Sequence, residues 1–198
     1  MDIKSNKIGE VIESSSGGFT AQCYELYEAP PLGALLKVNC DSGNVYGVVC
    51  FAGTHSLEPG RRIIARGEDA DTEEAIYQQN PQIKKLLTTD FQVSIAGYME
   101  GDKIFHYLPP KAVPLHRFVY YCSNEEVNAF TRSLDFFRLL VDAHLPVSCD
   151  EIIAACIRYT GQAYSDPLAF RVRAGRELAM LLGGDTYRLN SILTRLRL

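Results

Sequence analysis

The sequence contains no long apolar run and no signal for export. No stretch approaches the roughly 20 apolar residues that a membrane-spanning helix needs. Residues 1–30 lack the basic start and apolar core of a secretory signal peptide. The net charge is −4, so the chain also lacks the basic excess of a general nucleic-acid surface. These absences predict a cytoplasmic protein without a membrane span, and they argue against nucleic acid as a partner.

The motifs of common nucleotide and zinc sites are also missing. A phosphate-binding P-loop contains a Gly-Lys pair followed by Ser or Thr, and none of the seven lysines follows a glycine. Neither Cys-x-x-Cys nor His-Glu-x-x-His, two usual zinc-ligand spacings, is present. The sequence therefore predicts no nucleotide hydrolysis, no cofactor and no metal centre.

Cysteine is present, but its arrangement does not indicate a disulfide framework. The six cysteines fall within predicted strands or helices, where a small apolar thiol packs well. They are Cys23, Cys40, Cys50, Cys122, Cys149 and Cys156. A nucleophilic role would require one of them beside a base such as His106 or His116. We interpret the cysteines as reduced core residues.

Residues 8–51 show the period-two pattern of half-buried strands. Phe19, Ala21 and Cys23 alternate with polar or amphipathic neighbours, and a similar run covers residues 35–40. The Asp-Ser-Gly-Asn sequence at positions 41–44 is typical of a tight hairpin turn, because Gly and Asn tolerate positive φ. The pattern predicts the opening strands of a small β-barrel.

The same pattern returns later in the chain. Strands are expected over residues 91–96, 103–108 and 115–122. Gly47, in the middle of a strand, indicates a bend or bulge of the kind that barrels need. We therefore predict a closed or nearly closed barrel of about six strands over residues 8–122.

Residues 54–90 interrupt the strands. Two short helices are expected at residues 72–79 and 81–88, with Asn80 as the N-cap of the second. The acidic stretch at residues 67–72 suits an exposed loop better than a cation site, because its spacing matches no EF-hand. The sequence predicts a helical excursion from the barrel.

From Ser123 onward the pattern is helical. Capping boxes at residues 123–126 and 148–151 start two helices, the first of which should continue to Leu145. Apolar residues at three- and four-residue steps form one stripe on that first helix. They are Val127, Phe130, Leu134, Phe137 and Val141. The Asp-Pro pair at residues 166–167 and Asp185 start two more helices, which makes about four in total.

Charge changes at the same place as the hydrophobic period. Residues 1–122 carry 11 basic and 15 acidic side chains, whereas residues 123–198 carry 9 of each, and every base there is arginine. We therefore predict an α+β protein with an N-terminal small β-barrel domain (1–122, with a helical excursion at 72–88) followed by a C-terminal helical domain (123–198).

Several segments of the predicted barrel together resemble a known family. They are the Ile-Gly-x-Val opening at residues 8–11, the strands at residues 19–23 and 45–49, the Ile-Ala-Gly-Tyr segment at residues 95–98, and the prolines Pro109, Pro110 and Pro114 before the last strand. This order resembles the HAS-barrel, which HerA-type ATPases share with the α and β subunits of rotary ATP synthases. The resemblance covers a little over half of the chain. It implies a barrel with an assembly role, without the ATPase core that follows the barrel in that family.

The C-terminal helices concentrate positive charge. Residues 171–198 hold six arginines against only Glu177 and Asp185. The arginines are Arg171, Arg173, Arg176, Arg188, Arg195 and Arg197. Guanidinium groups pair bidentately with carboxylates or phosphates, so we predict that the first five form a partner-binding face. The alternative is that they are solvated helix faces, with Arg195 and Arg197 complementing a helix C-terminus.

These features favour a non-enzymatic adaptor or assembly factor that docks on a multi-subunit complex through its barrel and helical domain. One alternative is an accessory subunit of a HerA-like DNA-processing ATPase, which a basic groove with exposed tyrosines would support. Another is an enzyme with a site at the domain junction, which a pocket holding His106 or His116 beside a cysteine would support. We expect a protein partner, with an ATPase or an ATP-synthase-like complex among the candidates. The sequence leaves the oligomeric state open.

Overall fold

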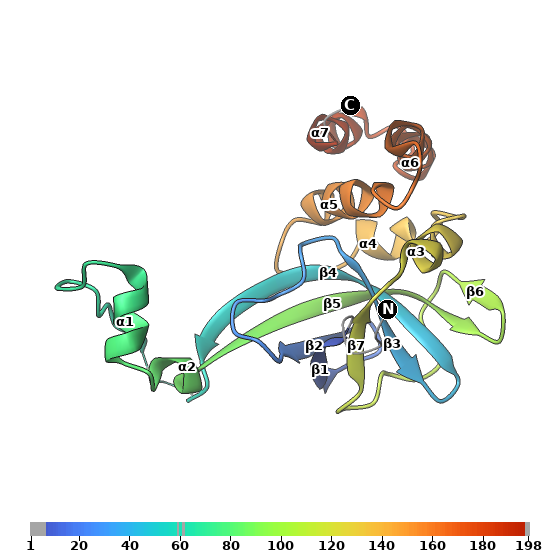
Figure 1. Cartoon of the computed structure of the whole chain (residues 1–198). Helices are drawn as coiled ribbons and strands as arrows, with labels where there is room; N and C mark the ends of the chain where they lie inside the picture. The colour runs from blue at the N-terminus through green and yellow to red at the C-terminus, as the bar shows by residue number, and fades with distance from the viewer. Residues whose placement is uncertain (1–6, 59, 61, 197–198) are drawn as a thin grey trace.

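The computed structural model describes residues 7–196 except residues 59 and 61, and it shows a β-barrel followed by helices (Figure 1). The strands are β1 (Lys7–Ser14), β2 (Gly18–Cys23), β3 (Leu35–Cys40), β4 (Gly43–Ser56), β5 (Leu87–Glu100), β6 (Lys103–Phe105) and β7 (Phe118–Tyr121). The helices are α1 (Glu73–Gln79), α2 (Ile83–Leu86), α3 (Asn124–Phe130), α4 (Phe137–Val141), α5 (Cys149–Gly161), α6 (Pro167–Leu181) and α7 (Thr186–Arg195). The predicted α+β class and the order of its two parts are confirmed.

Six antiparallel strands close the barrel. They follow the order β2-β1-β7-β3-β4-β5, and a further pairing of β2 with β5 joins the two ends. That pairing runs from Gly18 opposite Ser94 to Gln22 opposite Asp90. The short β6 pairs with the last residues of β5. The pairing of β4 with β5 shifts register between Tyr46 and Gly47, so the irregularity predicted at Gly47 is confirmed.

The barrel interior is filled by alternate residues of its strands. Val11, Ala21, Leu36, Phe91 and Val119 belong to this first core. The residues that alternate with them along each strand point outward. On β3, β4 and β5 many of these outward residues are also buried, because helices cover that face of the sheet. The continuous buried run Val45–Cys50 of β4 results from this double coverage.

Helices α3 to α7 form a helical layer on the outer face of β3, β4 and β5 (Figure 1). Helix α5 lies between the sheet and the α6–α7 pair, and its residues Ile152, Ile153 and Ile157 are fully buried. Leu35 and Val48 of the barrel belong to the same apolar cluster as these helix residues. The barrel and the helices therefore share one core, in addition to the core inside the barrel.

The change from strand to helix falls at Ser123. Its hydroxyl accepts a hydrogen bond from the Glu126 backbone N–H, and the Glu126 carboxylate accepts one from the Ser123 N–H at 2.8 Å. This capping box was predicted correctly. The second box was wrong, since the Ser148 side chain makes no capping hydrogen bond at α5.

The single helix predicted from Ser123 to Leu145 is split into α3 and α4, so five helices follow the barrel instead of four. Local side-chain bonds explain the break. The Ser133 hydroxyl donates to the Asp135 carboxylate at 2.7 Å and accepts from the Asp135 N–H at 3.2 Å, which competes with helical hydrogen bonding. The apolar stripe is nevertheless buried across the break.

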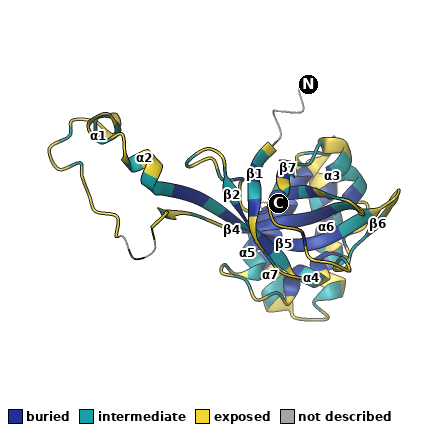
Figure 2. Ribbon diagram, turned by 90° about the horizontal axis from the view of Figure 1, so that it is seen from below, coloured by how far each residue is buried: buried dark blue, intermediate teal, exposed yellow. Residues whose placement is uncertain are grey.

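Beyond the barrel, β4 and β5 continue as a two-stranded arm that carries α1 and α2 at its end (Figure 2). The sequence predicted that the strands stop at Phe51 and resume at Phe91. The pairing instead extends to Ser56 opposite Leu87. This pairing shortens the helix predicted at residues 81–88 to α2. Asn80 ends α1 rather than capping the next helix, since its backbone N–H donates to the Ile76 carbonyl at 3.0 Å.

Candidate partner-binding site

The predicted arginines lie on the two outermost helices, α6 and α7 (Figure 1). Arg171, Arg173 and Arg176 belong to α6, whereas Arg188 and Arg195 belong to α7. Arg197 lies outside the described residues. The two helices contact each other and both contact α5, so the arginines come from one layer of the fold.

Two of these arginines fasten α7 to α5. The Arg188 Nε donates to Asp150 at 2.7 Å, and its Nη2 donates to the Val141 carbonyl at 2.8 Å. Arg195 pairs with Glu151 through its Nε. Hydrogen bonding to these carboxylates raises the pKa of both guanidinium groups. Both arginines are therefore bound to their own chain.

Arg173 is also used within the fold. Its Nη2 donates to the Thr131 carbonyl at 2.8 Å and its Nη1 to the Arg132 carbonyl at 3.2 Å, where α3 ends. The guanidinium lies over the rings of Tyr164 and Phe170, with distances of 5.7 Å and 5.2 Å to the ring centroids. These contacts hold α6 against the end of α3.

The other two arginines differ from this pattern. The Nε of Arg171 is buried without a hydrogen-bond partner among the described residues. Arg176 is exposed, and it contacts no acidic side chain in the described part of the chain. Of the five predicted partner-binding residues, Arg176 is the one that is exposed, whereas the other four are partly buried.

Arg176 lies within an exposed apolar stripe on α6. Leu168, Val172 and Met180 occupy the same face at four- and eight-residue steps, and they are 57%, 40% and 69% exposed. On the other side of α6, Phe170, Ala174 and Leu178 are buried. The sequence prediction missed this stripe, although its signal is the four-residue spacing around Arg176.

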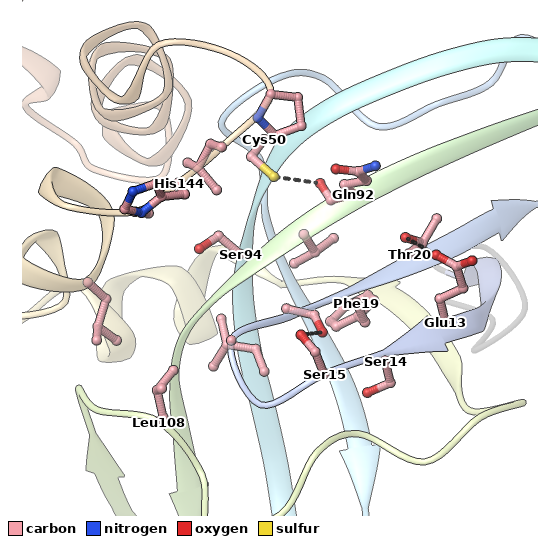
Figure 3. A pocket seen from close by; sticks show the side chains of 18 residues that line it. Glu13, Ser14, Ser15, Phe19, Thr20, Cys50, Gln92, Ser94, Leu108 and His144 are labelled. Atoms are coloured by element: carbon pink, nitrogen blue, oxygen red, sulfur yellow. Dashed lines mark hydrogen bonds between the residues drawn. The ribbon is translucent and has the colours of Figure 1, made fainter.

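A groove of about 570 Å³ lies between the barrel and the helical layer (Figure 3). The β1–β2 turn, β5 and the α4–α5 loop form its walls, and Cys50, Ser94 and His144 lie along it. The Cys50 thiol donates to the Gln92 carbonyl at 3.4 Å, and burial raises the pKa of this thiol to about 11. Cys50 is consequently protonated at neutral pH, which opposes a nucleophilic role.

The two histidines considered from the sequence do not line this groove. His106 lies against the rings of Phe130 and Phe136, its Nε2 is 3.0 Å from the Phe130 carbonyl, and burial lowers its pKa. His116 is on the surface, with its Nδ1 2.6 Å from the Glu10 carboxylate. Both have structural partners on other strands or helices.

Several other cysteines show the same tendency as Cys50. Burial raises the pKa of Cys23 to about 11 and also raises that of Cys122 and Cys156. Across residues 7–196, apart from 59 and 61, no cluster of three or more His, Cys, Asp or Glu side chains is arranged to hold a metal ion. The acidic residues 68–74 lie at the tip of the arm, on the surface.

None of the described helices is both long and apolar enough to cross a membrane. The exposed face of α6 combines apolar side chains with Arg176, which pairs with no acidic side chain among the described residues. Comparison of the chain with family models and with curated proteins gave no match.

Proposed function

We propose that this chain is a non-enzymatic adaptor or assembly factor that docks on a multi-subunit complex through the body formed by its barrel and helices. The observation that supports this function is the outward face of α6, where Leu168, Val172 and Met180 surround the unpaired Arg176. Contiguous apolar side chains on a surface helix mark an interaction site when they leave one face of the helix uncovered.

The chemistry of this face indicates the kind of partner. Three apolar side chains at helical spacing suit a second amphipathic helix, packed ridge into groove. Arg176 would pair with a carboxylate of that helix, because a guanidinium binds a carboxylate bidentately. Arg173, Arg188 and Arg195 support the interaction indirectly by holding α6 and α7 in place.

The resemblance to the HAS-barrel remains part of this proposal, and the closed six-stranded barrel is compatible with it. The alternative role beside a DNA-processing ATPase has weaker support. Tyr24 and Phe118 form an exposed ring pair under Lys7, but the Tyr24 hydroxyl donates to Glu10. A cation accompanied by a carboxylate does not make the basic track that a nucleic-acid backbone requires.

The experiment is affinity capture with the full-length protein, followed by crosslinking and quantitative mass spectrometry in a lysate of the source organism. The double variant Val172→Asp and Met180→Asp places two charges on the α6 face. Leu32→Asp and Leu115→Asp form the matched control, because both leucines are comparably exposed on the barrel side.

We expect the α6 variant to lose a defined set of captured proteins that the control retains. Arg176→Glu should weaken capture of the same set, and should do so more strongly at low salt than at high salt. Equal capture by the α6 variant and the control would exclude this face as the docking surface.

A further inference from the structure

The tip of the arm has no core of its own. From residue 57 to residue 87 none of the described residues is buried, and Figure 2 shows the tip in teal and yellow. Large apolar side chains are nevertheless present, and Ile63 and Ile64 are 55% and 60% exposed. An ordered segment normally offsets its loss of chain entropy by burying apolar surface. The tip therefore carries apolar surface that its own chain leaves uncovered.

This uncovered surface is shaped as a groove of about 360 Å³. Ile63 and Ile64 line one part of it, and Ile76, Ile83 and Leu86 of the two short helices line another. Grooves with apolar walls and a few polar groups are the usual form of a binding site. The tip is thus suited to receive an apolar side chain from another surface.

The tip carries nearly equal numbers of acidic and basic side chains, and the two kinds lie in different parts of its sequence. Residues 57–87 contain six carboxylates and five cations. Arg62 and Arg66 line the groove, with Glu73 as the acid in its lining. The acidic run at residues 68–74 comprises Glu68, Asp69, Asp71, Glu73 and Glu74. Among the described residues, neither arginine and none of these five carboxylates forms an ion pair.

We propose that two copies of this chain associate through their arm tips about a two-fold axis. The apolar groove of each tip is covered by the tip of the other copy, and Arg62 and Arg66 of one copy face the acidic run of the other. A two-fold interface uses every contact twice, so a patch that carries both charge signs can be complementary to itself. The tip, residues 57–87, is also large enough to form one side of a standard interface, which takes roughly 20–30 residues.

Hydrogen bonds fix the position of the tip relative to the barrel. The Tyr27 N–H donates to the Thr89 hydroxyl at 2.9 Å, and the Tyr27 and Tyr77 hydroxyls are 2.8 Å apart, which connects α1 to the barrel. A tip fixed in advance loses less entropy on association. The arm also carries the tip away from the barrel and helices (Figure 2), so two bodies can approach tip to tip. This association is independent of the proposed adaptor function, because the α6 face lies on the body.

The test is sedimentation equilibrium of the full-length protein from about 1 µM to about 100 µM, the range in which micromolar dissociation constants are resolved. The expected species is a dimer of twice the chain mass of 22.1 kDa. Reversing Arg62 and Arg66 to Glu should raise the dissociation constant at least about tenfold, because it sets like charges against each other. The control reverses Arg132 and Arg138, which are exposed on the helical layer and belong to neither proposed surface, and should leave the dissociation constant unchanged.

A complementary variant sharpens the test. Asp69→Lys and Asp71→Lys should also weaken self-association, whereas a mixture of this variant with the Arg62→Glu, Arg66→Glu variant should form a heterodimer. Ile63→Ser with Ile64→Ser should weaken the dimer without changing charge. A wild-type protein that is monomeric throughout the concentration range would overturn the proposal. A dimer unaffected by both charge reversals, or a mixture that stays monomeric, would overturn it as well.

Discussion

Substitution of Gly33 by Ala tests how closely the barrel approaches the helical layer. Gly33 adopts φ +80°, in the left-handed region, and its N–H donates to the Val49 carbonyl at 2.9 Å. A Cβ atom at this position would overlap the backbone of Ala155 and Cys156 in α5 and lie 2.7 Å from the Ala155 Cβ. The left-handed conformation costs about 1–2 kcal/mol for a residue with a Cβ. Displacing packed backbone adds about 1–3 kcal/mol.

Gly101→Ala is the matched control. Gly101 has φ +58°, and a Cβ added there meets no atom within 4 Å, so this variant carries the conformational cost alone. Urea unfolding followed by circular dichroism should show a loss of about 3 kcal/mol for Gly33→Ala and about 1 kcal/mol for Gly101→Ala. Equal losses in the two variants would refute the close approach of the β2–β3 loop to α5.

Three further predictions concern individual side chains. Arg188→Leu should lower the free energy of unfolding by about 2 kcal/mol, because it leaves the half-buried Asp150 without its partner. Arg176→Leu should change the free energy of unfolding by less than about 0.5 kcal/mol. Urea midpoints measure both effects, and equal shifts would contradict the different roles of these arginines. Burial lowers the pKa of His106, so stability should fall as the pH drops from about 6.5 through the folded-state pKa, and His106→Gln should remove that part of the pH dependence of the urea midpoint. Burial raises the pKa of Cys50 from 9.0 to about 11, so the folded state keeps this proton longer and stability should decline as the pH rises from 9 to 11. The free energy of unfolding of Cys50→Ala should decline less steeply over the same pH range. An identical dependence on pH in both proteins would argue against a buried thiol.

Features that depend on short stretches of chain were predictable from the sequence. The alternation at Phe19, Ala21 and Cys23, the turn at residues 41–44 and the capping box at Ser123 each involve residues within a few positions of one another. Their local chemistry restricts the backbone before any tertiary contact forms. The barrel, its strand number and the position where the helices begin follow from such signals.

Two errors concern where strands and helices end, one decided by pairing of distant segments and the other by local side-chain bonds. Residues 52–56 and 87–90 show no clear apolar alternation, yet they form strands because each pairs with the other. In the first predicted helix, the apolar stripe continues from Val127 to Val141 across a real break. The stripe shows which residues face the core, but it does not show that one helix ends at Phe130 and another begins at Phe137.

The candidate site shows the same division. The sequence concentrates arginines on α6 and α7, but it does not show that Arg188 meets Asp150, which lies 38 positions earlier, or that Arg173 meets the end of α3. Helix α6 also carries two interleaved sets at four-residue spacing, and each could face a core. They are Phe170, Ala174 and Leu178 in one set and Leu168, Val172, Arg176 and Met180 in the other. The sequence by itself determined that α6 has these two faces, because spacing along a helix is local. Only the packing of α6 on α5 and α7 decided which face is buried and which is left open to a partner.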